Sequence, residues 1–212
     1  MGDLNDIIIL IPVILFALSV HEFSHGIVAY RLGDPTAYQA GRLTLNPLSH
    51  LDPVGTLMLF VAGIGWAKPV PVDPRYFQNP RRDMLWVALA GPGSNMVLAL
   101  LSGLIIRAMK ANVEMTLSLP FSSQLVAMVY RSLQINLALA VFNLLPIPPL
   151  DGSKILGGLL PPEYDHFLYN LERYGPGVLF GLVMFGMLTG VSILWLLIGP
   201  FVRFFAAVFA GA

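Results

Sequence analysis

Cysteine is absent from the chain, and charged side chains make up only 11% of its 212 residues. The lack of cysteine excludes disulfide bonds and cysteine-ligated zinc fingers. Twelve basic and twelve acidic residues give a net charge of zero, so the composition offers no basic excess for binding nucleic acid. Typical soluble domains carry about 25% charged residues. The scarcity of charge therefore argues against a soluble fold with a polar shell.

Apolar residues, in contrast, make up 56% of the chain, and the mean hydropathy is +0.74. A transmembrane helix needs about 20 consecutive apolar residues. Four stretches meet or approach this length, at residues 7–30, 84–106, 122–145 and 178–198, and the last could extend to Ala210. With no repeat and no low-complexity linker, the sequence predicts one all-α, polytopic membrane domain over residues 1–212. The acidic start of the chain is unlike a signal peptide, so we expect the first span to be retained.

Residues 32–83 separate the first two spans and are rich in Pro, Gly and Asp. Within them, the partly alternating segment 38–45 (YQAGRLTL) predicts a short strand or hairpin. Residues 54–64 are apolar but too short to span a membrane, which fits a re-entrant or interfacial element. Irregular backbone at membrane depth is tolerated only on protein or beside a wet cavity. We therefore expect a membrane-associated β or re-entrant region, next to a cavity, after the first helix.

Basic residues are concentrated in the same loop, and none lies in the N-terminal tail. The basic residues of the loop are Arg42, Lys68, Arg75, Arg81 and Arg82. Because cytoplasmic loops carry an excess of Lys and Arg, this loop is predicted to be cytoplasmic and the N-terminus external. The chain is then a multi-pass protein of the cell (inner) membrane.

The first span contains HEFSH at positions 21–25, an H-E-x-x-H pattern. His21 and His25 lie four residues apart on one helix face and could hold a single metal ion. Glu22 lies beside the first of them and could take a proton from water. Placing these side chains in a membrane span costs several kcal/mol unless they bind a partner. The alternative interpretation is a polar contact between helices.

A catalytic zinc ion needs a third protein ligand and keeps its fourth position open. The remaining acidic and histidine candidates are Asp34, His50, Asp52, Asp151 and His166. Asp151 is favoured, because it follows a proline-broken span end (NLLPIPPLDG, 143–152), where an acid at membrane depth is costly unless it lines a site. A surface Asp-Gly turn is the alternative for this residue.

The other four candidates have simpler interpretations. Asp34 is expected to shape a turn, His50 and Asp52 to support a loop, and His166 to be exposed on an amphipathic helix.

Polar residues of the second and third spans should meet the HEFSH segment. At 1.5 Å per residue, HEFSH lies roughly 8–14 Å below the cytoplasmic surface. The GPGSN segment of the second span brings Asn95 to the same depth, and Asn143 and Asp151 come from the inner end of the third. The sequence thus predicts one site on the cytoplasmic side.

These three motifs together resemble the site-2 protease family of intramembrane metalloproteases, in a small branch without PDZ or CBS domains. The resemblance implies a Zn²⁺ cofactor, transmembrane protein substrates in contact with membrane lipid, and hydrolysis of peptide bonds. It implies that His21, His25 and Asp151 hold zinc and that Glu22 is the general base.

The resemblance also assigns residues to the substrate. Asn143 would stabilise the scissile carbonyl, and Asn95 would shape the site. Leu43, Thr44 and Leu45 would receive an extended substrate by strand addition, since a peptide must leave its helix before hydrolysis.

Two other functions use the same residues. A metal transporter would use the His and Asp side chains as a transit site. A non-catalytic scaffold would hold a structural metal in a closed site, with His50 as a fourth ligand.

Overall fold

The computed structural model describes residues 4–55 and 67–211, and this part of the chain is almost entirely helical. The longer helices are α1 (Leu4–Arg31), α4 (Pro80–Ala111), α6 (Ser122–Asn143), α8 (Asp165–Thr189) and α9 (Ile193–Ala210). The shorter helices are α2 (Thr36–Gln39), α5 (Val113–Ser118) and α7 (Asp151–Leu159). Three 3₁₀ turns complete them: η1 (Pro47–His50), η2 (Pro74–Tyr76) and η3 (Pro162–Tyr164).

Among the described residues, four helices are long and apolar enough to cross a membrane. They are Ile8–Arg31, Pro80–Ala111, Ser122–Asn143 and Ile193–Ala210. The predicted all-α polytopic class is therefore confirmed, and the first three predicted spans coincide with α1, α4 and α6. The apolar side chains of α4 that face outward fit a lipid environment: Leu101 and Leu104, for example, are each 50% exposed.

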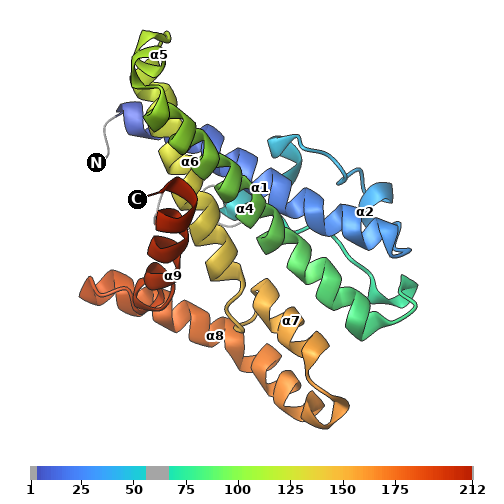
Figure 1. Ribbon diagram of the computed structural model, residues 1–212. Helices are drawn as coiled ribbons and strands as arrows, with labels where there is room; N and C mark the ends of the chain where they lie inside the picture. The colour runs from blue at the N-terminus through green and yellow to red at the C-terminus, as the bar shows by residue number, and fades with distance from the viewer. Residues whose placement is uncertain (1–3, 56–66, 212) are drawn as a thin grey trace.

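The predicted fourth span, residues 178–198, is wrong in its bounds. Gly190 ends α8 in the left-handed conformation, with φ +74°, which glycine adopts without strain. Ser192 then begins α9 by accepting a hydrogen bond from the backbone N–H of Trp195. The apolar run is thus split between two helices, which follow one another around this turn (Figure 1). The fourth candidate span is α9.

The predicted strand at residues 38–45 is also wrong. Tyr38 and Gln39 belong to α2, and residues 40–45 form no strand. Asp34 accepts hydrogen bonds from the backbone N–H and the hydroxyl of Thr36, and these local bonds favour a helical turn over an extended chain. Gly41, at φ +65°, ends that turn.

Strand-like pairing within the described residues occurs farther along the chain. Leu51 and Ala67 form an isolated antiparallel bridge, and the Lys68 N–H donates to the His50 carbonyl at 2.9 Å. The predicted re-entrant element at residues 54–64 lies outside the described residues beyond Gly55.

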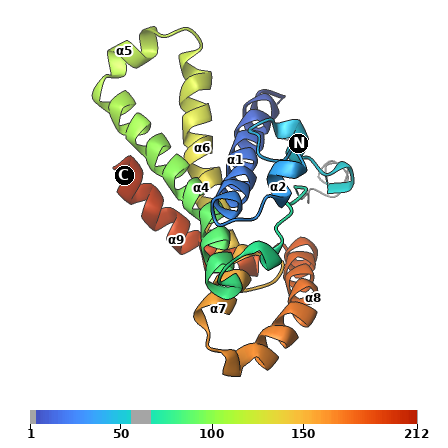
Figure 2. The same ribbon diagram turned by 90° about the vertical axis from the view of Figure 1, so that its right-hand side faces the viewer.

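Helix α4 is the centre of the bundle. It packs against α1, α6, α7 and α9, as both views show (Figures 1 and 2). A buried apolar cluster joins α4, α6 and α9; it comprises Ala99, Ile106, Leu133, Leu137, Val202 and Ala210. Helices α7 and α8 lie together at the end of the bundle opposite α5 (Figure 2). This arrangement brings the start of α7 beside the N-terminal part of α4, near Val87 and Ala88.

Candidate metal centre

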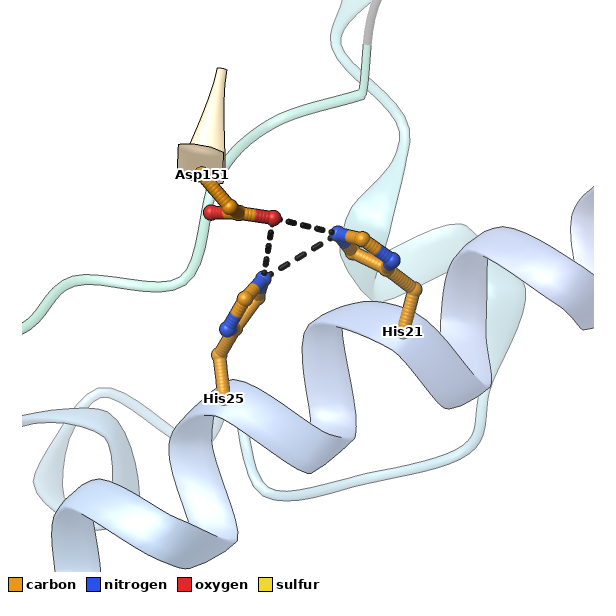
Figure 3. Close-up of side chains that lie close together, drawn as sticks. All are labelled: His21, His25 and Asp151. Carbon is orange, nitrogen blue, oxygen red and sulfur yellow. Dashed lines mark hydrogen bonds and ion pairs between the residues drawn. The ribbon is translucent and has the colours of Figure 1, made fainter. Parts of the chain in front are cut away.

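Three buried side chains from two distant parts of the chain meet between α1, α4 and α7. Helix α1 continues unbroken through HEFSH, so His21 and His25 lie one turn apart on the same face. Asp151 is the first residue of α7, directly after the proline-rich segment. The two Nε2 atoms are 3.1 Å apart, and each lies 3.2 Å from Asp151 Oδ2 (Figure 3). The three candidate ligand atoms therefore form a nearly equilateral triangle.

The size of the triangle fits a tetrahedral metal ion. Nitrogen and oxygen ligands about 2.0–2.1 Å from zinc are about 3.3 Å from one another in a tetrahedron. The observed separations of 3.1 and 3.2 Å are close to that value. One face of such a tetrahedron is supplied by the protein, which leaves the fourth position to the adjoining cavity.

The protonation of the two rings also indicates a cation. His21 Nδ1 lies 2.6 Å from the side-chain oxygen of Asn95, and His25 Nδ1 lies 2.7 Å from the carbonyl oxygen of Val87. Both partners can only accept, so each Nδ1 donates, and each Nε2 faces the centre of the triangle. Asp151 Oδ2 is buried and has no hydrogen-bond partner among the described residues. Three electron-rich atoms facing one another fit a metal ion.

Burial of Asp151 by itself would raise the pKa of its carboxyl group, but the contacts with the two imidazoles outweigh burial and lower that pKa. The carboxylate is therefore ionised at neutral pH and available as a metal ligand.

A chain of buried amides sets the orientation of Asn95. Its side-chain nitrogen donates to Asn136 Oδ1 at 2.9 Å, and the Asn136 nitrogen donates to the Ser132 carbonyl at 2.9 Å. The oxygen of Asn95 is thereby directed to His21. Asn95 is fully buried behind the ring, so it contacts His21 instead of the space in which a substrate would lie. Asn136 was not assigned from the sequence; its only signal there is a polar residue within an apolar span.

Two glycines allow the close approach of these elements. A Cβ atom on Gly91 would lie 2.6 Å from His21 Nε2 and would also collide with His25 Nε2. A Cβ atom on Gly152 would collide with the carbonyl oxygens of Leu144 and Leu145. Both glycines lie within the GPGSN and LDG motifs, yet the sequence alone gave no reason to assign them a steric role.

A cavity of about 130 Å³ opens beside the triangle. Glu22, Asn143 and Lys154 are among the polar side chains that line it, together with all three candidate ligands. The backbone N–H of Val70 donates to Glu22 Oε2 at 2.8 Å and so holds the carboxylate. The side-chain nitrogen of Asn143 donates to the Leu139 carbonyl of its own helix at 3.0 Å. The arrangement places a candidate base and a candidate hydrogen-bond donor around one small space.

Comparison with known proteins identifies the family. Residues 9–171 match the model of peptidase family M50. The chain belongs to this family. The "putative zinc metalloprotease YwhC" of Bacillus subtilis is 40% identical over 204 residues, which cover 94% of this chain and 92% of that protein. The "putative zinc metalloprotease Rip2" of Mycobacterium tuberculosis is 35% identical over 176 residues, covering 81% of this chain and 64% of the relative. No solved structure gives a significant match.

Membership of family M50 confirms the resemblance drawn from the motifs, and with it the prediction that the chain is a peptidase. The prediction of a metal cofactor is supported by the described residues, where His21, His25 and Asp151 form a group able to hold an ion.

The segment expected to receive the substrate does not line the cavity of this M50 peptidase. Leu43 packs against Gly26, where a Cβ atom would lie 2.6 Å from its side chain. The carbonyl of Thr44 accepts a hydrogen bond from His50 Nε2 at 2.8 Å, and Leu45 is 50% exposed. Residues 43–45 are therefore not among the described residues that line the metal cavity.

The remaining candidates have structural contacts. Asp34 is fully buried and accepts hydrogen bonds from the backbone N–H groups of Thr36 and Asp73, so it shapes a turn as predicted. Asp52 accepts a bond from the Gly55 N–H at 2.7 Å. His50 does not line the metal cavity, so the closed site predicted by the scaffold hypothesis lacks its fourth ligand.

Proposed function

We propose that this M50 chain is an intramembrane zinc endopeptidase, formed by one membrane domain over residues 1–212, that cleaves membrane-spanning or membrane-adjacent proteins. The observation that carries the proposal is the triangle of His21, His25 and Asp151 beside Glu22, with both histidines on a helix long enough to cross a bilayer. The family match does not favour the metal-transporter alternative.

In this proposal His21, His25 and Asp151 hold the ion through Nε2, Nε2 and Oδ2. A bound zinc ion would supply Lewis acidity, which activates water and polarises a peptide carbonyl. Asn95 and the Val87 carbonyl fix the two ring orientations, as such outer contacts do in zinc proteins generally.

Glu22 acts as the general base. Its carboxylate lies on the same helix turn as His21 and His25, lines the cavity, and is held by the Val70 N–H. It takes a proton from the attacking water and passes that proton to the departing amine. Asn143, which also lines the cavity, offers its amide N–H to the carbonyl oxygen of the substrate.

The substrate reaches this site from the lipid. We assign contacts with the flanking substrate chain to Leu43, Thr44 and Leu45, outside the cavity; Leu45 is exposed, and residues 43–45 form no strand in the structure. The basic residues around the site, among them Lys68 and Arg81, favour a cytoplasmic position for the metal centre in the cell membrane.

Glu22→Gln tests the proposal. The variant should keep its zinc, because Glu22 is not a ligand, and should lose at least about 10²-fold in cleavage of a model transmembrane substrate, the usual contribution of a general base. Glu114→Gln, on the exposed helix α5, is the matched control and should cleave normally. Asp151→Ala should lose both zinc and cleavage. Full cleavage by Glu22→Gln, or full zinc retention by Asp151→Ala, would refute the assignment.

A further inference from the structure

A second cavity, of about 410 Å³, lies between α7 and α8 at the same end of the bundle as the metal cavity. Met84 and Lys154 line both cavities, so the two spaces adjoin through these side chains. We call the second space the α7–α8 groove. Its other principal walls are formed by Gly157 on α7 and by Leu168 and Leu171 on α8.

The metal cavity is too small to hold more than the groups around one peptide bond. Its volume of about 130 Å³ is below the roughly 300–1,000 Å³ of typical ligand pockets, whereas the groove, at about 410 Å³, falls within that range. A polypeptide bound at the metal must therefore continue into an adjoining space, and the groove adjoins the cavity at Met84 and Lys154.

One face of α7 leads from the metal to the groove. Asp151, Lys154 and Gly157 follow one another at three-residue spacing, so a candidate ligand, an ammonium group and a bare backbone lie along the same face. A Cβ atom on Gly157 would be in ordinary van der Waals contact with Leu168 Cδ1 at 3.8 Å, so a larger side chain there would enter the space between α7 and α8. The opposite wall, on α8, carries the apolar side chains of Leu168 and Leu171 together with the acidic Glu172.

Lys154 is the charged group at the junction. It is exposed, and within the described part of the chain no carboxylate lies within ion-pair distance of its ammonium group. A cation with open donors beside a catalytic cavity is complementary to a peptide carbonyl or carboxylate oxygen.

We propose, building on the peptidase function above, that the α7–α8 groove binds the extended segment of the substrate that leaves the metal site, and that Lys154 is a positioning residue holding a backbone oxygen of that segment. Apolar substrate side chains pack against Leu168 and Leu171. The groove thus selects the substrate residues next to the cleaved bond. The chemical step at the metal centre does not depend on the groove.

Cross-linking tests occupancy without turnover. A photoreactive phenylalanine analogue is placed at Leu171, in the groove, in the Glu22→Gln background, with a substrate that the wild type cleaves. The control position is Tyr169, which is 62% exposed on the same helix but does not line the groove. We expect at least about tenfold more substrate adduct at position 171. Equal or weaker labelling there would overturn the proposal, whereas a substrate left uncut by the wild type would count against the peptidase function itself.

Kinetics test the contacts. Gly157→Phe should fill the groove and raise KM at least about tenfold, while its zinc content stays unchanged. The control is Gly177→Phe on α8, where a Cβ atom meets nothing within 4 Å. Lys154→Met should raise KM with little change in kcat, and Lys154→Arg should restore the wild-type value. Wild-type KM in both Gly157→Phe and Lys154→Met would refute the groove as a substrate site.

Discussion

Replacing Gly91 by alanine should remove zinc while leaving the fold intact. The added Cβ atom would lie 2.6 Å from His21 Nε2 and would collide with His25 Nε2. Ordinary contacts are about 3.5 Å, so the His21 ring must retreat by roughly 0.9 Å. Metal–ligand distances tolerate only about 0.2 Å. The two rings therefore cannot keep their positions on one ion.

The expected loss of zinc affinity follows from which atoms the substitution displaces. Loss of a contact behind a ligand typically lowers zinc affinity by about 10–100-fold. Gly91→Ala moves the ligand atoms themselves, so we expect a decrease of at least about 100-fold, equivalent to about 2.8 kcal/mol of binding free energy.

Gly93→Ala is the matched control. Both substitutions lie in α4 and favour the helix by about 0.5–1 kcal/mol. A Cβ atom on Gly93, however, meets nothing within 4 Å. This variant should bind zinc as the wild type does, so a difference between the two variants isolates the contact with the histidines.

The measurement is the zinc content of purified protein after dialysis against a series of chelator concentrations. Circular dichroism establishes that both variants remain helical. If helical Gly91→Ala retained zinc at the same chelator concentration as the wild type, the proposed ligand positions would be incorrect.

Three further outcomes are expected. Asn136→Ala should weaken zinc binding by about 10–100-fold, because the amide of Asn95 loses the acceptor that directs its oxygen to His21; unchanged chelator resistance would contradict this. Acidification should release zinc, because protons compete with the ion for the ligand atoms; full retention of zinc in dialysis at about pH 4 would contradict this. Gly190→Ala should cost about 1–2 kcal/mol of stability, because its φ of +74° disfavours a Cβ atom, and should lower Tm by several degrees in a thermal melt that leaves the control Gly181→Ala unchanged or higher.

Local patterns were sufficient where the physics is local. The spacing of His21 and His25 fixes a common helix face whatever surrounds them, and the apolar length of a segment measures its ability to cross a bilayer. For this reason the first three spans, the paired histidines and the membrane class followed from the sequence. The predicted bounds of the fourth span were wrong because the hydropathy of a segment does not reveal the left-handed turn that Gly190 permits between α8 and α9.

The strand prediction for residues 38–45 was wrong for a related reason. Its alternation predicted a strand, but Asp34 and Gly41 impose a local turn, and a strand needs a partner that the pattern cannot supply.

The sequence by itself thus determined a helical membrane protein with a paired-histidine motif on its first span. Only the tertiary structure decided which acid joins the histidines, that Asn136 orients Asn95, and that Gly91 must lack a side chain. These features depend on the distances between α1, α4, α6 and α7. Such distances are set by packing among residues far apart in the chain, and no local pattern encodes them.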